Sequence, residues 1–115
     1  MSLPQEGSLL RIFIGEGDKH EGHPLYAWIV ARAKEKGLAG ATVLRGVMGF
    51  GANSRIIHTF KIERLSEDLP VVIEIVDRRE KLEAFLAFID DKIHAGLATL
   101  EKAEVRFYRS GAPPA

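Results

Sequence analysis

The sequence predicts an α+β domain in which two helices lie against one face of a four-stranded sheet. Three observations support this fold class. Four segments alternate in the period of a strand, two others repeat apolar residues at helical spacing, and their order along the chain is β-α-β-β-α-β. That order is the split β-α-β arrangement of ferredoxin-like sandwiches.

Residues 8–15 are the first predicted strand, since apolar side chains occupy alternate positions there. A polar, glycine-rich loop follows up to residue 23. Pro24 then stands where a helix tolerates proline, at its first position, and Gly37 supplies a stop signal. Between them, apolar residues recur at the i, i+3, i+4 and i+7 spacing of a helix.

The second predicted strand, residues 40–48, is apolar in both phases, and the G-F-G sequence at residues 49–51 ends it. Because a strand gains no packing from glycine, this sequence indicates a turn. The loop that follows, residues 52–68, begins with a polar run. Alternation at residues 56–62 predicts a further extended piece inside it.

The second half of the chain supplies a strand, a helix and a last strand. Residues 69–76 are apolar enough for a central strand. Asp77 is expected to cap the second helix, with Glu80 three residues on in capping-box position. The apolar face of this helix ends at the stop signal Gly96, and the final strand is predicted over residues 98–108.

Both faces of the predicted sheet carry apolar side chains. Phe13, Leu44, Val72 and Val76 are out of phase with the residues that would face the helices. They would therefore lie on the face that the helices leave open. Because an exposed apolar face usually marks an association surface, we expect an oligomer.

Composition bounds the class of protein. A chain of 115 residues, 46% hydrophobic, is expected to form one domain, residues 8–109, with flexible termini at residues 1–7 and 110–115. Sixteen basic residues balance sixteen acidic ones without a basic cluster, which argues against a nucleic-acid partner. Absence of cysteine excludes disulfides, thiolate catalysis and zinc-thiolate sites. Without a signal peptide or a long apolar run, a cytoplasmic protein is expected.

Several long motifs in fixed order carry a resemblance to a known family. They are G-E-G-D at residues 15–18, P-L-Y at 24–26, G-L-A-G-A-T-V-L-R-G at 37–46 and L-S-E-D-L-P-V-V at 65–72. The chain from Leu9 to about Tyr108 resembles the uncharacterised PII-like family called domain of unknown function 190. The G-F-G sequence and the L-P-V-V-I-E-I-V-D sequence from Leu69 also resemble the PII signalling proteins.

This resemblance implies a homotrimer of ferredoxin-like subunits with an extended T-loop between the second and third main strands. In PII proteins, clefts between subunits near the base of that loop bind adenine nucleotides. The T-loop reports the bound state to a partner, often a transporter or an enzyme. We therefore expect a PII-like regulatory binding protein that senses an adenine nucleotide and signals through its T-loop.

The resemblance also implies which residues bind the ligand. Glycines 49 and 51 let backbone amides approach a phosphate, and Arg45 would suit a phosphate as a bidentate fork or, equally, form a salt bridge at the rim. Glu16 or Asp18 could accept hydrogen bonds from ribose or adenine, or belong to a hydrated loop that caps the first helix. The expected ligand-binding set is Glu16, Asp18, Arg45, Gly49, Phe50, Gly51, Gly96, Leu97 and Thr99, with residues 96–99 supplied by a neighbouring subunit. The expected regulatory loop residues are Asn53, Ser54, Arg55 and His58.

The chain departs from the PII pattern before its last strand. There PII proteins carry a run whose lysine meets phosphates, whereas this chain has H-A-G-L-A-T-L-E-K, with no lysine until Lys102. We therefore expect AMP or ADP to be favoured over ATP.

Two other functions stay open. A divalent-metal-binding or structural trimer like the CutA relatives of this fold would use the acidic, histidine-bearing loop with His20 and His23. H-E-G-H is not a zinc signature, so no metal is expected. A nucleotide-acting enzyme is the third hypothesis, but Ser54 and His58 lack an evident acid to orient the histidine, and no catalytic constellation is found.

Overall fold

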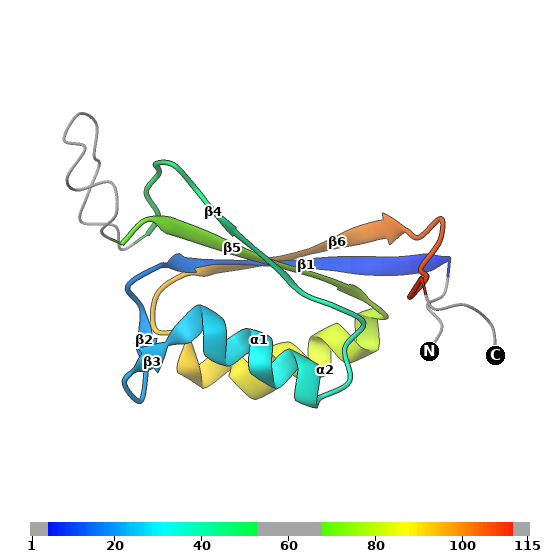
Figure 1. The fold of residues 1–115 in the computed structure, drawn as a ribbon, viewed down its shortest axis with the longest axis horizontal. Coiled ribbons are helices and arrows are strands. Elements are labelled where there is room, and N and C mark those ends of the chain that lie inside the picture. The colour runs from blue at the N-terminus through cyan, green and yellow to red at the C-terminus, as the bar shows by residue number, and fades with distance from the viewer. Residues whose placement is uncertain (1–4, 53–67, 112–115) are drawn as a thin grey trace.

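The computed structural model describes residues 5–52 and 68–111 of the chain (Figure 1). In order, its elements are β1 (Glu6–Gly15), β2 (Lys19–His20), β3 (His23–Pro24), α1 (Leu25–Glu35), β4 (Thr42–Arg45), β5 (Pro70–Asp77), α2 (Arg79–Ile89), the 3-10 turn η2 (Asp90–Lys92) and β6 (Leu97–Glu104). Antiparallel pairing gives one sheet in the order β4-β5-β1-β6. The predicted ferredoxin-like fold class is confirmed.

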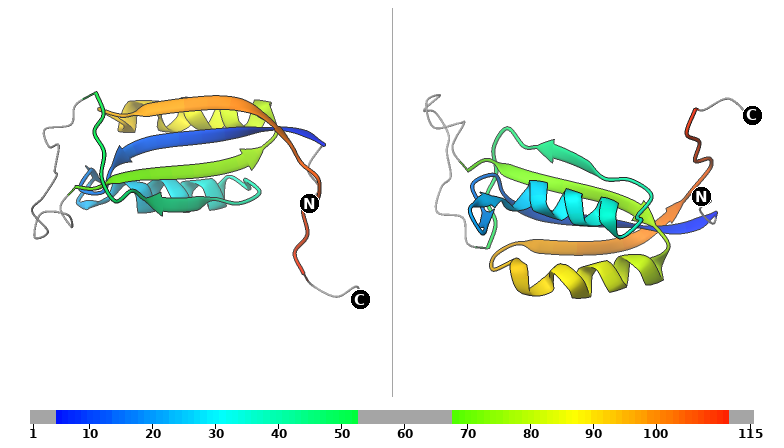
Figure 2. Two further views of the ribbon diagram at one scale, coloured as in Figure 1. Left: turned by 90° about the horizontal axis from the view of Figure 1, so that it is seen from above. Right: turned by 60° about the horizontal axis from the view of Figure 1, so that its bottom comes forward.

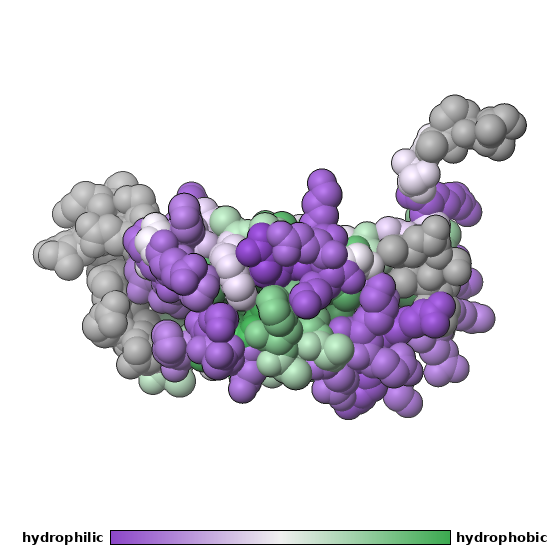
Figure 3. Space-filling view, turned by 90° about the horizontal axis from the view of Figure 1, so that it is seen from below, coloured by the Kyte–Doolittle hydropathy of each residue, from purple (hydrophilic) through white to green (hydrophobic). Residues whose placement is uncertain are grey.

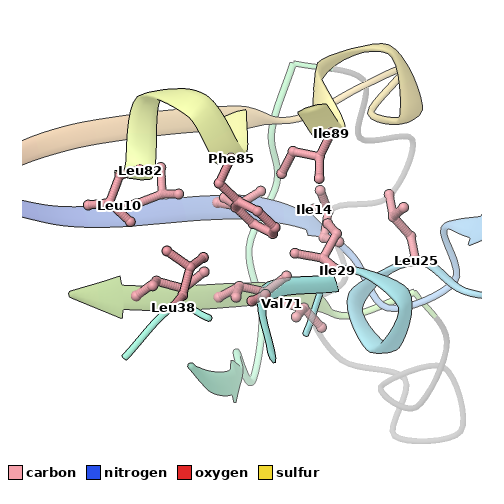
Figure 4. Packing of buried hydrophobic residues seen from close by; sticks show 13 residues of the cluster. Leu10, Ile14, Leu25, Ile29, Leu38, Val71, Leu82, Phe85 and Ile89 are labelled. Atoms are coloured by element: carbon pink, nitrogen blue, oxygen red, sulfur yellow. The ribbon is translucent and has the colours of Figure 1, made fainter. Parts of the chain in front are cut away.

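Both helices lie against the same face of the sheet, side by side and roughly along the strands (Figures 1 and 2). Alternate residues of β1 and β5 point into this layer, because successive strand side chains face opposite ways. Ile12, Ile29, Ile73 and Ile89 are each fully buried there. Figure 4 shows the helix side chains meeting those of the two central strands in one continuous core.

Strands β1 and β6 differ from the predicted spans. β1 begins at Glu6, two residues early, because Glu6 and Gly7 pair with Glu104 and Ala103 of β6. β6 ends at Glu104, where β1 offers no further residues, although a strand to residue 108 was expected. The chain continues instead as an irregular segment whose Tyr108 hydroxyl donates to the Ala39 carbonyl at 2.6 Å.

The first helix begins differently from the prediction. Pro24 is the residue before α1 rather than its first helical residue, and it also pairs with Lys19 in the short β2–β3 hairpin. Three residues at helical spacing, Leu25, Ile29 and Ala33, are buried. The hairpin lies inside the segment expected to be loop, and its two-residue strands are too short for periodicity to reveal.

Asp77 does not cap α2 as predicted. The residue before the helix is Arg78, and neither residue makes a side-chain cap. The Asp77 side chain is only 2% exposed, and its carboxylate accepts the Ala39 amide at 2.9 Å and the Arg78 amide at 2.7 Å. As the last inward-facing residue of β5, it ties the connection after α1 to the start of α2.

The second strand is shorter and more exposed than predicted. β4 spans only Thr42–Arg45, and all of its side chains are exposed in the single chain. It pairs with β5 on one side and forms the edge of the sheet, and Leu44 remains 48% exposed.

An ion-pair network crosses the open face of the sheet. Arg11 of β1 donates to Glu74 of β5 at 2.9 Å and to Glu101 of β6 at 2.8 Å. The hydrogen bond to Glu74 is the largest of the effects that raise the pKa of Arg11, and attraction by both carboxylates adds to it. Partly buried apolar side chains such as Phe13 and Val72 flank the network, so this face is apolar around a charged centre.

The outer surface of the helical layer has the opposite character. Figure 3 shows mainly hydrophilic side chains there, around a smaller apolar patch near the middle. Phe88 of α2 is 39% exposed, and Lys36 Nζ lies 4.0 Å from the centre of its ring. None of the described helices is long and apolar enough to cross a membrane.

Candidate functional site

Four strand ends meet at one end of the sheet. Antiparallel pairing places Gly15 opposite Pro70, Arg45 opposite Val71, and Leu97 opposite Phe13. A cavity of about 170 Å³ opens there. Its walls are Phe13, Ile14, Gly15, Asp18, Gly49, Phe50, Gly51, Ala52, Asp68, Pro70, Ala95 and Gly96. Five of the nine predicted ligand-binding residues, Asp18, Gly49, Phe50, Gly51 and Gly96, line this one cavity.

The G-E-G-D loop on one side of the cavity is locked by its own hydrogen bonds. The Gly15 amide donates to the Asp18 carboxylate at 3.0 Å, and the Gly17 amide donates to Asp68 Oδ1 at 3.0 Å. The Glu16 amide donates to the Leu69 carbonyl at 2.7 Å, and the Asp18 amide to the Gly15 carbonyl at 3.1 Å. All four amides are therefore engaged. This loop can offer them to an anion only by breaking these hydrogen bonds.

Asp18 also positions the first helix. Its backbone carbonyl accepts the amide of Leu25, the first residue of α1, at 2.8 Å. The capping role considered for this loop is thus performed by main chain, since α1 has no side-chain cap.

The G-F-G turn on the other side of the cavity is bound less tightly. The Gly46 amide donates to the Pro70 carbonyl at 2.7 Å, which anchors the turn to the start of β5. Beyond that point, the amides of Gly49, Phe50 and Gly51 have no hydrogen-bond partner within the described residues. Phe50 is 73% exposed, and a Cβ built on Gly51 would meet no atom within 4 Å.

Gly96 forms the wall opposite this turn. Its φ is 158°, and a Cβ built on it would lie 2.6 Å from the carbonyl oxygen of Phe13, so only glycine fits beside β1. The resemblance to PII proteins implies that a neighbouring subunit supplies residues 96–99. Within a single chain, however, the β1–β6 pairing already brings Gly96 to the turn.

Arg45 and Glu16 form an ion pair beside the cavity. Arg45 Nη2 donates to Glu16 Oε2, and neither residue lines the cavity itself. The Arg45 side chain is 61% exposed, whereas that of Glu16 is 19% exposed. Glu16 Oε1 is buried and has no hydrogen-bond partner in the described part of the chain. Both predicted site residues are therefore close together, with the arginine already paired.

A larger cavity adjoins the first. It has a volume of about 560 Å³ and shares the walls Ala52, Ala95 and Gly96 with the smaller one. Its remaining walls are Ile12, Leu86, Asp90, Ile93, His94, Leu97 and Ala98. Leu97 thus lies in this second cavity. Thr99 lines neither cavity and stands opposite Arg11 on the open face.

Seven of the twelve wall residues of the smaller cavity were missed by sequence reasoning, among them Asp68 and Pro70. Asp68 and Pro70 close the cavity beside the G-E-G-D loop. Asp68 lies in the L-S-E-D-L-P motif, which could have pointed to it, but its partner Gly17 is 51 positions away. Only the β1–β5 pairing brings the two together.

The predicted regulatory residues Asn53, Ser54, Arg55 and His58 lie outside the described residues. Among residues 5–52 and 68–111, no three histidine or acidic side chains gather in a way that could hold a metal ion. His20 and His23 face each other in the β2–β3 hairpin, and the His20 ring packs 4.6 Å from that of Trp28.

The chain matches a known protein family over most of its length. The family model DUF190, described as "Uncharacterized ACR", matches residues 7–105. A protein called "UPF0166 protein" from Aquifex aeolicus (strain VF5) is 48% identical over 97 residues, which are 84% of this chain and 90% of that protein.

Solved structures share the fold at low sequence identity. CPII from Thiomonas intermedia K12, described as a nitrogen regulatory PII-like protein bound to ADP, AMP and bicarbonate, superposes with a TM-score of 0.64 at 15% identity. That match covers 87% of this chain and 88% of CPII. A putative PII-like signalling protein from Thermus thermophilus gives a TM-score of 0.59 at 19% identity, over 87% of this chain and 89% of that one. The chain belongs to the DUF190 family, and its fold is that of the PII-like proteins.

Proposed function

We propose that this protein is a trimeric PII-like regulatory protein that binds an adenine nucleotide and signals through the loop of residues 52–68. The single observation that carries the proposal is the G-F-G turn. Its amides have no partner among the described residues, and they border a cavity closed on the far side by Gly96. Free backbone amides in a glycine turn are a phosphate-binding arrangement.

The phosphate would lie at the turn. Gly51 leaves open space where a side chain would otherwise stand, so an anion can approach its amide closely. Arg45 lies at the same end of the sheet and is exposed enough to turn a remaining N–H toward that phosphate. CPII, which has the same fold, is described as bound to ADP and AMP, and this supports an adenine nucleotide as the ligand.

The nucleoside would occupy the adjoining cavity. Its volume of about 560 Å³ lies in the range of small-molecule pockets, and Ile93 and Leu97 give it an apolar wall. Asp90 and His94 are the polar groups there that could read a base or a ribose. Because the cavities share the wall at Gly96, one ligand can span both.

AMP or ADP is the proposed ligand rather than ATP. The described walls of the smaller cavity carry the carboxylates of Asp18 and Asp68 and no lysine or arginine. In the proposed trimer, the open apolar face would be covered by neighbouring copies, and a cytoplasmic location is part of the same proposal. The partner that reads the loop would be a transporter or an enzyme.

Calorimetric titration tests the ligand. Wild-type protein should bind AMP or ADP, and Arg45→Ala should weaken that binding about ten- to a hundredfold, because hydrogen bonds to charged groups contribute roughly 1.5–3 kcal/mol. Arg79→Ala is the matched control: Arg79 is also 61% exposed and paired with a glutamate, but it lies on α2. Absence of binding by the wild type would remove the nucleotide hypothesis. Equal affinity in the two variants would remove only Arg45.

Light scattering tests the assembly. At micromolar concentration the mass should be three times 12.7 kDa. The physical reason is the open face, where Leu44 and Leu97 remain about half exposed, at 48% and 57%, in a single chain. Protein that stays monomeric under these conditions contradicts the trimer, and with it any site that requires neighbouring copies.

A further inference from the structure

We propose that Glu16 sets the number of negative charges that the nucleotide site accepts, by holding Arg45 in an ion pair. This inference rests on the proposed function and concerns the same site. It starts from the unequal surroundings of the two partners. Glu16 is mostly buried, with 19% of its side chain exposed, whereas the Arg45 side chain is 61% exposed.

Glu16 cannot follow Arg45 into solvent. Its backbone amide is held by the Leu69 carbonyl at 2.7 Å, and its Oε1 atom is buried without a hydrogen-bond partner in the described part of the chain. Within that part, Arg45 is the cation that balances its charge. A ligand that drew Arg45 away would therefore strand a largely buried carboxylate, which is strongly unfavourable.

Arg45 can share its donors but not its charge. A guanidinium has five N–H donors in a fixed fork, and the contact with Glu16 engages Nη2. The remaining donors can still reach one phosphate group. The formal charge of Arg45 is already matched by Glu16, so phosphate groups beyond the first find no counter-charge in this pair.

Two further carboxylates increase the effect. Asp18 and Asp68 are fixed beside the cavity by the amides of Gly15 and Gly17. Together with Glu16, they place carboxylates around Arg45 among the described residues. The described charged side chains at this end of the sheet therefore favour a ligand of low charge. Glu16 is the member of this group whose loss also frees Arg45.

The first test is the affinity ratio of ATP to AMP, measured by calorimetry in EDTA so that no divalent cation neutralises the phosphate groups. Glu16→Gln keeps the shape and removes the charge, and it should raise this ratio about three- to tenfold, as expected for unit charges several ångströms apart near a protein surface. Glu35→Gln is the matched control, because Glu35 also pairs with an arginine, at 2.7 Å, but on α1. A thermal melt checks that both variants fold.

The second test uses the wild-type protein alone. Raising the ionic strength from about 0.05 M to 0.5 M shortens the screening length, so the ATP-to-AMP affinity ratio should rise if the site repels extra charge. A site with spare cations would show the reverse. Two results overturn the inference while the proposed function stands. One is an ATP-to-AMP affinity ratio that falls as salt rises, and the other is an equal change in this ratio in Glu16→Gln and Glu35→Gln. Absence of any nucleotide binding by the wild type overturns both.

Discussion

Two glycine-rich turns lie at the same end of the sheet, and they differ in what their backbone amides do. In the turn of residues 15–18, every amide donates to a carboxylate or a carbonyl of the chain. In the turn of residues 49–51, no amide has a partner among the described residues. Both sequences contain two glycines separated by one residue. Glycine spacing alone therefore does not distinguish a structural turn from a binding turn.

The difference follows from the neighbouring acidic residues. The first turn contains Asp18 and lies against Asp68, whose carboxylates accept two of its four amides, and backbone carbonyls accept the other two. The second turn is flanked by apolar residues, and Phe50 between its glycines is 73% exposed. A carboxylate beside the turn satisfies the amides from within, and its absence leaves them for a ligand. Substitutions in the two turns should therefore separate stability from binding.

The largest expected effect is on stability, in the locked turn. A Cβ on Gly15 would lie 2.3 Å from Asp68 Oδ1, so Gly15→Ala must displace the carboxylate that holds the Gly17 amide. We expect a loss of about 1–3 kcal/mol in the free energy of unfolding, as for other overpacked sites. Denaturant unfolding against the wild type measures it. Gly40→Ala is the control, because a Cβ built on Gly40 meets no atom within 4 Å, and it should leave the free energy of unfolding nearly unchanged. Gly22 is unsuitable as a control because its φ of 83° would strain an alanine.

Much of this fold could be predicted from the sequence, because periodicity reports which face of an element is buried. The inward positions of β1 and β5, including Ile12 and Ile73, are read directly from alternation. Asp77 was misassigned for a related reason. Its position before a helix is typical of a cap, but its inward phase on β5 turns the side chain toward Ala39 instead.

The candidate site could be predicted only in part, because it depends on pairing between distant strands. The G-F-G turn and Gly96 stood out as glycines, and the resemblance to PII proteins named them. That Arg45 meets Glu16 depends on both β4 and β1 pairing with β5, which no local pattern encodes. The contact of Asp68 with Gly17 has the same origin.

The second expected effect is on binding, in the open turn. Gly51→Ala introduces a methyl group that meets no atom within 4 Å, and it should leave the free energy of unfolding within about 0.5 kcal/mol of the wild type. A phosphate seated against the turn would, however, meet that methyl group. AMP affinity, measured by calorimetry, should fall about three- to tenfold, which corresponds to roughly one hydrogen bond. Unchanged affinity would place the phosphate elsewhere.

The smallest expected effect tests whether Asp18 stabilises the turn of residues 15–18 or binds the ligand. In the wild type, the Gly15 amide donates to the Asp18 carboxylate at 3.0 Å. Asp18→Asn keeps an acceptor oxygen for this amide but removes the negative charge that strengthens the hydrogen bond. The free energy of unfolding should fall by about 0.5–1 kcal/mol, since charged acceptors form stronger hydrogen bonds than neutral ones. AMP affinity should not fall, because the Asp18 carboxylate binds the Gly15 amide and its negative charge repels a phosphate group. A large loss of AMP affinity with unchanged stability would reverse the assignment and make Asp18 a ligand-binding residue. That outcome would also mean that the Gly15 amide can be released, so the two glycine turns would differ less than their hydrogen bonds indicate.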